Sequence, residues 1–484
     1  MQRAGRFIRP LNFGVVVGNL LLILRLIGFT FVPPLLVALI AGEIDLAIAF
    51  GGCGAGSFLI GQFIRRKETL SIASAREPAT KESLAVVALS YLVTALIGAV
   101  PFMLVGAPHD ALFESMSGIT TTGVSMFRPE VLPVSLVFFR SYLQWIGGVG
   151  IVILSVLVLI GPGQNSYRLY ASEFGDEMIA GSVSATARIV ATTYAVLTAI
   201  GFLSFLASGL PAFDSLIHVM STVSTGGYSS STSNIGQYPL GAPHAVAAVF
   251  MIAGAIGFPA YYALRQGRFD SFFGDVQLRT LLVILAVSAA LLYFTQGMDP
   301  DELVPDMFHL VSAATATGFS AGDLGELDDG RKALMSVLMF IGGSAGSTAG
   351  GLKLLRFVVL LKTLRWFLLR QLLPDEARIP VRVGATVIDD RQLREVLAVL
   401  VFTLILAVGG TLAFTLSGHA FVDSVFDTIS SLHTVGLSTG VVSPDNRAWQ
   451  KVMVTALMWA GRIELTPLLV LGYPAIYPRS GRPS

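Results

Sequence analysis

A short pattern centred on glycine occurs four times in this sequence and constrains the fold more than any other feature. Serine stands two positions after each central glycine and again six positions before it, and a polar, ionisable residue stands nine positions before it. Read from position −9 through −6 to the centre, the sets are Glu114, Ser117 and Gly123; His218, Ser221 and Gly227; His309, Ser312 and Gly318; and Asp427, Ser430 and Gly436. This shared register predicts four structurally equivalent repeats. In the second copy Gly226 precedes Gly227, so either glycine can be aligned with the other three.

The composition is that of an integral membrane protein. Of the 484 residues, 54% are hydrophobic and 13% are charged, whereas a soluble domain has about 25% charged residues. Apolar runs of about 20 residues, the length that crosses a bilayer, recur along the chain. Strand-like alternation is absent, so helices must satisfy the backbone hydrogen bonds. Cys53 is the one cysteine, which excludes an intrachain disulfide bond and a cysteine-based metal cluster.

We therefore expect an all-α polytopic membrane protein with four pseudo-symmetric helix–pore-loop–helix repeats around one central pore. An N-terminal helix pair should precede them, with spans near residues 14–41 and 44–63 and a kink at Pro33-Pro34. First helices of the repeats are expected near residues 83–105, 187–207, 278–293 and 395–416, and second helices near 134–160, 243–264, 333–361 and 452–471. The resulting units are residues 1–82 for the helix pair and its loop, and repeats at 83–165, 180–270, 275–375 and 390–475.

Lysine and arginine predict the orientation. Loops on the side of the glycine pattern hold Arg128, Arg331, Lys332, Arg447 and Lys451, while most of the 32 Lys and Arg residues lie on the opposite side. Because cytoplasmic loops are enriched in these residues, the glycine pattern should enter the membrane from outside, with both termini in the cytoplasm. The first apolar run has no small-residue cleavage site and is expected to remain as an anchor.

The chemistry of the pattern favours a cation pore. Non-helical backbone at membrane depth is tolerated only where protein buries it or water lines it, and four such segments around an axis would aim carbonyl oxygens at one line, as potassium filters do. Glycine permits the positive φ that this needs, and threonine adds hydroxyl oxygens. The alternative is that Gly and Thr merely allow close helix packing. The candidate ion-coordinating residues are Thr121, Thr122, Gly123, Thr225, Gly226, Gly227, Ala316, Thr317, Gly318, Thr434, Val435 and Gly436.

Several longer motifs identify a family. They are DALFES at 110–115 leading to TTTG at 120–123, RSYLQWIGGVGI at 140–151, GGSAGSTAGGLK at 342–353 and GRIE at 461–464. Over nearly the whole chain these motifs resemble the TrkH/TrkG subunit of bacterial Trk potassium uptake systems, within the TrkH–KtrB–HKT superfamily. The opening helix pair is also Trk-like, whereas the fourth copy, TVGLS at 434–438, looks more like the Ktr type.

The resemblance implies potassium-selective uptake across the bacterial cytoplasmic (inner) membrane by a multi-pass homodimer. It also implies a TrkA-like cytosolic ring that binds NAD(H) or ATP and regulates transport. In plant relatives, serine at the first filter glycine is associated with sodium selectivity, so Gly123 implies a preference for potassium.

A gate and a barrier are expected below the filter. Glycine costs about 1 kcal/mol relative to alanine inside a helix, so residues 342–351 should form a loop within the membrane, the alternative being a close helix–helix contact. By the resemblance, this loop closes the pore and Arg462 is a positive barrier to cations. The alternative for Arg462 is an internal ion pair with a carboxylate. The gate and barrier residues are Gly342, Gly343, Gly346, Gly350, Gly351, Lys353 and Arg462.

The expected function is thus potassium translocation. A proton- or sodium-coupled cation symporter and a less selective K⁺/Na⁺ transporter remain alternatives, because broken helices also build binding sites in transporters. The six histidines lack metal-ligand spacing, which argues against an enzyme. No dinucleotide-binding or Walker A pattern occurs, so nucleotide should bind the partner and not this chain. The basic stretch at 353–394 either docks that partner or only sets the orientation. Membrane lipid is the other expected partner, and nucleic acid is not expected.

Overall fold

The computed structural model describes residues 11–68, 80–159, 183–296, 300–374, 380–384 and 386–472, and regular structure in these ranges is almost entirely α-helical. Six of the described helices are long and apolar enough to cross a membrane, or up to eight if two sharply bent pairs each count as one span. The chain is therefore a polytopic helical membrane protein, as predicted.

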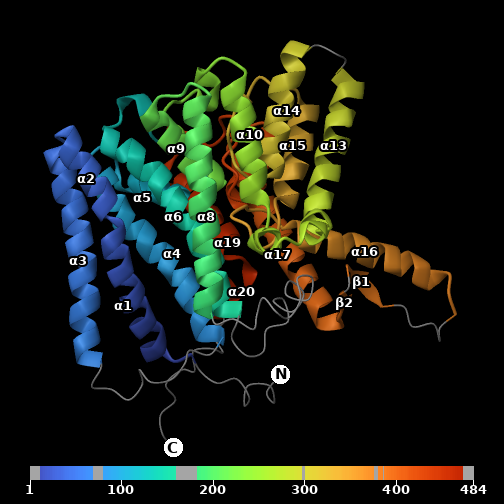
Figure 1. Cartoon of the computed structure of the whole chain (residues 1–484), viewed down its shortest axis with the longest axis horizontal. Coiled ribbons are helices and arrows are strands. Elements are labelled where there is room, and N and C mark those ends of the chain that lie inside the picture. Colours follow the sequence, from blue (N-terminus) through green and yellow to red (C-terminus); the bar gives the residue numbers. More distant parts are fainter. Residues whose placement is uncertain are drawn as a thin grey trace, which may run out of the picture.

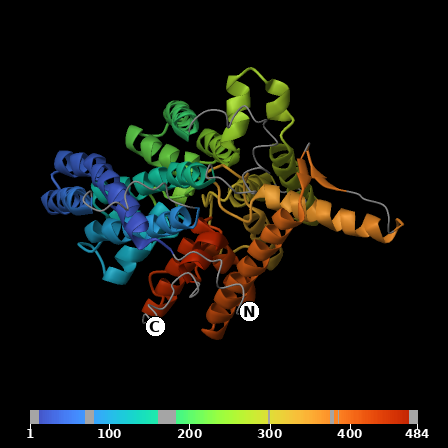
Figure 2. The same cartoon turned by 90° about the horizontal axis from the view of Figure 1, so that it is seen from below.

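The N-terminal helix pair lies at one edge of the bundle (Figures 1 and 2). It consists of α1 (Phe13–Thr30), α2 (Val32–Ala41) and α3 (Ile44–Glu68). Pro33-Pro34 can begin a helix but cannot continue one, which separates α1 from α2 at Phe31 and confirms the predicted kink. At the turn before α3, Glu43 accepts hydrogen bonds from the backbone N–H of Val134 (2.7 Å) and Ser135 (3.1 Å). Glu43 thereby caps a helix of the first repeat and joins it to the pair.

Four repeats follow, each with a spanning helix and a half-helix. The spanning helices are α4 (Thr80–Phe102), α8 (Val183–Ala207), α13 (Val276–Gln296) and α17 (Asp390–Leu416). The half-helices are α5 (Pro108–Ile119), α9 (Ala212–Val223), α14 (Pro300–Ala314) and α18 (Phe421–Leu432). The spanning helices lie close to the predicted ranges. Seen from below, the repeats follow one another around a common centre (Figure 2).

The second helices of the repeats depart from the prediction. The first repeat has one helix, α6 (Val134–Leu159), and the third has α15 (Asp329–Ile341) and α16 (Leu354–Gln371) on either side of the expected loop. In the second repeat α10 (Ala242–Ala255) meets α11 (Phe258–Arg265) at 94°, and in the fourth α19 (Ala448–Ile463) meets α20 (Leu465–Gly472) at 112°. The straight spans expected at 243–264 and 452–471 are therefore wrong. Pro259 and Pro467 lie in the first turn after each bend, where proline cannot continue the preceding helix.

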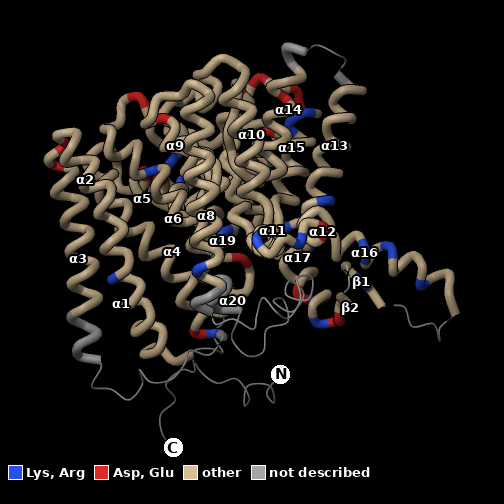
Figure 3. Tube along the Cα trace, viewed as in Figure 1, with Lys and Arg blue, Asp and Glu red and all other residues tan. Residues whose placement is uncertain are grey.

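Three short elements lie on the side of the bundle where α16 lies. They are α12 (Phe269–Phe273) and an antiparallel pair, β1 (Val381–Val383) and β2 (Thr386–Ile388). Val383 and Ile388 of the strands pack against Leu355 and Val358 of α16. α16 itself extends sideways from the bundle and carries several Lys and Arg residues (Figures 1 and 3).

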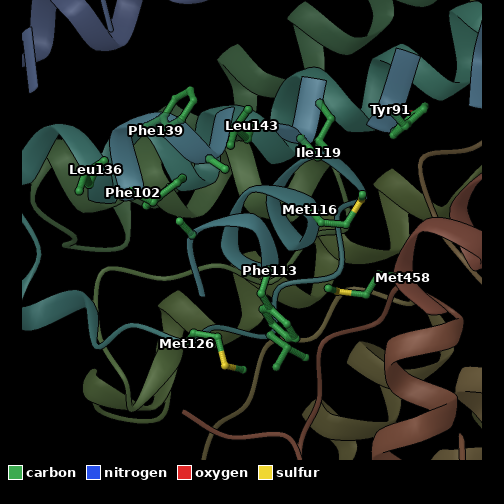
Figure 4. Close-up of a cluster of buried hydrophobic side chains, with 14 of the residues drawn as sticks. Tyr91, Phe102, Phe113, Met116, Ile119, Met126, Leu136, Phe139, Leu143 and Met458 are labelled. Atoms are coloured by element: carbon green, nitrogen blue, oxygen red, sulfur yellow. The ribbon is translucent and has the colours of Figure 1, made fainter. Parts of the chain in front are cut away.

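Aromatic packing fixes the first repeat against the helix pair. The ring of Phe139 in α6 has its centroid 5.6 Å from Phe31, 5.0 Å from Phe50 and 5.6 Å from Phe102. Figure 4 shows Phe113 and Met116 of α5 in the same buried cluster. Because α5 is enclosed by apolar side chains, its end, where the glycine pattern begins, is held in place.

Candidate functional site

The four copies of the glycine pattern adopt the same backbone conformation. We call residues 121–123, 225–227, 316–318 and 434–436 Gly segments 1 to 4. Their first residues, although not glycine, have positive φ: 58° at Thr121, 52° at Thr225, 54° at Ala316 and 53° at Thr434. Their last residues are also positive: 90° at Gly123, 78° at Gly227, 91° at Gly318 and 101° at Gly436. Since non-glycine residues rarely adopt positive φ, its recurrence at four equivalent positions marks a geometry that the surrounding structure imposes.

This conformation settles the alignment of the second copy. Gly227 has the positive φ of the other central glycines, whereas Gly226 is not among the residues with positive φ. Gly227 is therefore the equivalent of Gly123. In each segment the middle residue lies between two left-handed ones, and this alternation lets successive carbonyl oxygens face the same side.

Each segment is held to the end of its half-helix. The N–H of its middle residue donates to the carbonyl oxygen of the serine at position −6. The four bonds join Thr122 to Ser117 (2.8 Å), Gly226 to Ser221 (2.7 Å), Thr317 to Ser312 (2.9 Å) and Val435 to Ser430 (2.8 Å). The carboxyl ends of all four half-helices thus point at the Gly segments. Because a helix carries a partial negative charge at this end, the arrangement favours a cation there.

The serine hydroxyls add a second bond in three repeats. The N–H of the central glycine donates to Ser117 Oγ (3.1 Å), Ser312 Oγ (3.1 Å) and Ser430 Oγ (3.0 Å) in repeats 1, 3 and 4. In repeat 2 the hydroxyl of Ser221 donates to Ser141 Oγ of α6 instead, at 3.0 Å.

The ionisable residues at position −9 are buried and hold the chain just beyond each segment. Glu114 accepts from the N–H of Met126 (2.9 Å), Asp427 from the N–H of Thr439 (2.7 Å), and His309 Nε2 from the N–H of Ala321 (3.0 Å). His218 Nε2 and Ser229 Oγ share a hydrogen bond of 3.1 Å. The side chain at position −9 therefore links the half-helix to the chain that follows the Gly segment.

The four segments close a ring. A Cβ atom placed on each central glycine would overlap the carbonyl oxygen of the middle residue in the next segment. The pairs are Gly123 with Gly226, Gly227 with Thr317, Gly318 with Val435 and Gly436 with Thr122. The order 1, 2, 3, 4 and back to 1 brings together the twelve residues that the sequence marked as ion-coordinating. Thr121 Oγ1 and Thr434 Oγ1 are buried there without a hydrogen-bond partner among the described residues, and an unpaired buried hydroxyl is costly unless a ligand satisfies it.

The expected loop lies directly against this ring. Residues 342–353 are non-helical, with positive φ at Gly342, Gly346, Gly351 and Lys353. Thr348 Oγ1 donates to the carbonyl oxygens of Val223 and Gly254, each at 3.0 Å. A Cβ on Gly350 would overlap the carbonyl oxygen of His433, and one on Gly343 would crowd Ala349 and Ala255. The loop is therefore packed between repeats 2 and 4.

Cationic side chains meet at the loop. Arg462 of α19 is buried and donates to the carbonyl oxygens of Thr348 (2.9 Å) and Gly147 (3.2 Å). Lys353 Nζ donates to the carbonyl oxygen of Ala349. Glu464 pairs with Arg356 at 2.5 Å, so Glu464 is not the partner of Arg462. Among the described residues Arg462 forms no ion pair with a carboxylate, contrary to the alternative of an internal ion pair, and its two hydrogen bonds instead tie α19 to the loop.

The outer ends of the half-helices are joined across repeats. Lys332 Nζ lies 2.8 Å from Asp423, and Lys451 Nζ lies 2.6 Å from Asp110. Both aspartates are in the first turn of a half-helix, where negative charge is favourable.

The outer loops of repeats 1 and 2 are joined as well. Glu130 accepts hydrogen bonds from the N–H and hydroxyl of Thr232 and from Ser231. Burial acts to raise the pKa of Glu130, but these hydrogen bonds together outweigh it and lower the pKa to about 2. Glu130 is therefore ionised at neutral pH and holds the two loops together.

Two side chains that sequence reasoning assigned no role belong to the site. Arg140 Nε lies 2.8 Å from Glu114, and Gln144 contacts Gly segment 2. Arg140, Ser141 and Gln144 are all buried. Polar residues four apart within an apolar span were the available signal, because such residues face the interior of a helix bundle.

Comparisons of this chain with family models, with curated proteins and with solved structures agree on one family. Residues 66–475 match the family model TrkH, described as cation transport protein. An uncharacterized cation transporter from Methanocaldococcus jannaschii is 35% identical over 79% of this chain and 80% of its own length. The Trk system potassium uptake protein TrkH of Halomonas elongata is 31% identical over 94% of this chain and 97% of its own. The crystal structure of the potassium transporter TrkH from Vibrio parahaemolyticus superposes with a TM-score of 0.83 at 25% identity, covering 96% of this chain and 100% of that chain.

Proposed function

This chain belongs to the TrkH family of cation transport proteins, and on that premise we propose that it takes up K⁺ through the ring of four Gly segments. The observation that carries the proposal is the closed ring, in which every central glycine faces a carbonyl oxygen of the next segment. Carbonyl oxygens arranged in this way replace the hydration shell of a potassium ion. The unpaired hydroxyls of Thr121 and Thr434 and the four half-helix ends favour a cation at the same place.

The loop at 342–351, together with Lys353, is proposed as the gate. Its position against the ring and its many glycines support this role, because glycine can adopt backbone conformations that other residues cannot. Gly350 is packed against His433, immediately before Gly segment 4, so movement of the loop changes the path next to the filter.

Arg462 is proposed as a barrier to cations below the filter. Two unit charges 4 Å apart repel by about 4 kcal/mol at an effective dielectric constant of 20. Its two carbonyl partners hold the guanidinium next to the loop without cancelling its charge. The barrier therefore slows passage while the loop is in place.

Regulation is proposed to come from a TrkA-like cytosolic ring that carries the nucleotide. The Lys and Arg residues of the 353–394 stretch, several of which lie along α16 (Figure 3), support a basic docking surface for this ring. In this arrangement the Gly segments open outward, both termini are cytoplasmic, and two chains form a homodimer with one pore each.

The test is growth rescue of a potassium-requiring bacterial strain on low potassium, with the regulatory partner present. We expect rescue by the natural chain and weaker rescue, with loss of K⁺ preference over Na⁺, for Gly123→Ser. Failure of the correctly inserted natural chain to rescue growth would refute potassium uptake. Rescue by Gly123→Ser with unchanged K⁺ preference would refute the role of the ring.

A further inference from the structure

Gly segment 2 lacks a restraint that the other three segments have. In repeats 1, 3 and 4, the serine hydroxyl at position −6 accepts the N–H of the central glycine. Repeat 2 also has this serine, Ser221, but its hydroxyl is turned to Ser141 of α6. The register in the sequence gives no warning of this difference.

A side chain from the neighbouring repeat takes the place of the missing bond. The amide nitrogen of Gln144 donates to the carbonyl oxygen of Gly226, and its Oε1 accepts from the N–H of Tyr228 at 3.1 Å. Gly226 and Tyr228 flank the central Gly227, so one amide holds the backbone on both sides of it. Gln144 is 0% exposed, and an amide bonded at both ends in a buried site has a fixed orientation.

The double glycine of the second copy follows from this contact. A Cβ atom on Gly226 would collide with the amide group of Gln144. The backbone of Gly226 does not itself require glycine, because Gly226 is not among the residues with positive φ. The other segments carry Thr122, Thr317 and Val435 at this position. We therefore attribute the glycine at position 226 to the amide group of Gln144, which occupies the space that a side chain would need.

Gln144 also lies beside the first segment. A Cβ atom on Gly123 would come within 3.5 Å of Gln144 Nε2. The amide thus occupies the junction between Gly segments 1 and 2, where Gly123 faces the carbonyl oxygen of Gly226.

We propose that Gln144 is a positioning and specificity-determining residue, which sets the carbonyl of Gly226 in the ring and replaces the serine restraint in repeat 2. The inference rests on the proposed function, in which the four Gly segments form the filter. Discrimination between K⁺ and Na⁺ depends on the number, spacing and field strength of the carbonyl oxygens. A hydrogen-bond donor on the carbonyl oxygen of Gly226 changes the position and the field strength of that oxygen.

The first test compares K⁺ and Na⁺ flux through the purified full-length chain in proteoliposomes. Gln144→Leu keeps the size of the side chain and removes both hydrogen bonds. We expect the K⁺/Na⁺ flux ratio to fall roughly two- to tenfold, the range that corresponds to one net hydrogen bond, here the bond to the carbonyl oxygen of Gly226. Ser312→Ala, which removes the serine restraint in repeat 3, should lower the ratio similarly, and Ser221→Ala should leave it unchanged. Loss of folded protein lowers both fluxes together and leaves the ratio unaffected.

Gln144→Glu, which keeps the acceptor for Tyr228 and loses the donor for Gly226, should also lower the ratio.

The second test is a double-mutant cycle between Gln144 and Gly226. Gly226→Ala should lower the flux ratio in the natural chain and have a much smaller additional effect in a Gln144→Ala background, because the collision is then removed. If Gln144→Leu and Gln144→Glu both keep the K⁺/Na⁺ flux ratio of the natural chain, the inference is overturned. The proposed function of the Gly segments as the filter is not affected by that result. An effect of Ser221→Ala as large as that of Ser312→Ala, or additive effects in the cycle, would also overturn it. Absence of K⁺ preference in the natural chain would refute the proposed function itself.

Discussion

Single residues in the ring are constrained in two separate ways. A central glycine must adopt positive φ, and it must also leave room for a carbonyl oxygen of the next segment. The first constraint alone costs a non-glycine residue about 1–3 kcal/mol. Thr121, Thr225, Ala316 and Thr434 have φ of 52–58°, within the left-handed region, whereas the central glycines lie at 78–101°, where a side chain is more strained. The second constraint is what excludes every side chain.

Two glycines in repeat 4 separate these constraints. Gly436 and Gly440 have φ of 101° and 94°, but a Cβ on Gly436 meets the carbonyl oxygen of Thr122, whereas one on Gly440 meets nothing within 4 Å. We expect Gly436→Ala to abolish K⁺ preference and Gly440→Ala to preserve it, at a stability cost of about 1–3 kcal/mol. The ratio of rubidium uptake to sodium uptake, with rubidium in place of potassium, measures this preference in the two variants. Equal loss of preference in both would show that backbone strain alone explains the need for glycine.

The charge of Arg462 gives a second prediction at this scale. Arg462→Ala should raise K⁺ flux in proteoliposomes by about tenfold or more, because removing even a third of a 4 kcal/mol barrier has that effect. Arg462→Lys keeps the charge and loses the planar donor group, so its flux should stay near the natural level. An equal rise in both variants would assign the effect to the lost contacts with Thr348 and Gly147 instead.

Among the elements, the second helices of the repeats differ most from what a regular repeat would give. α6 is continuous, while the other three are interrupted at Ile256, at residues 342–353 and at Glu464. The interruption in repeat 3 is packed against the end of α9 and the end of α10 through Thr348. The side chains of Thr348, Arg462 and Gln277 hold this loop by hydrogen bonds, so removing one of them should favour its displacement.

A change at Thr348 tests how the loop is held. Thr348→Val keeps the shape and leaves the carbonyl oxygens of Val223 and Gly254 without this donor, at a cost of about 1–3 kcal/mol. We expect increased K⁺ flux in the absence of the regulatory partner. The control is Ser347→Ala, whose hydroxyl bonds within the loop, donating to Ser344 and accepting from the N–H of Ala349. A natural flux in Thr348→Val would show that these bonds do not keep the loop in place.

At the scale of the whole molecule, the ring requires that four repeats keep their positions relative to one another. Partly buried Lys–Asp pairs join repeat 3 to repeat 4 and repeat 4 to repeat 1 at the outer rim. These pairs act at the start of the half-helices, far along the chain from their partners. Like the contacts within the ring, these ion pairs hold neighbouring repeats together.

Breaking one of these pairs should lower the stability of the assembled bundle. Lys451→Met leaves Asp110 without its cation, and loss of one partner of a buried pair costs about 3–5 kcal/mol, less here because Asp110 is 19% exposed at its side chain. The melting temperature in detergent should fall by several degrees and recover in part when Asp110→Asn is added. Arg391→Met, which breaks an exposed pair with Glu395, should change it little. An equal fall for both would mean that the rim pair has no special role.

The sequence by itself determined the membrane class, the number of repeats and the register of the ring. Apolar runs, the serine at −6 and the central glycine are local requirements, imposed by the bilayer and by the half-helix cap, and so they recur at each copy. It also predicted the loop at 342–351, because glycine at that density is incompatible with a helix interior. Only the tertiary structure decided which of Gly226 and Gly227 is central, and that Glu464 pairs with Arg356. These outcomes depend on contacts between residues far apart in the chain, such as Gln144 with Gly226, whose free energy no local pattern records.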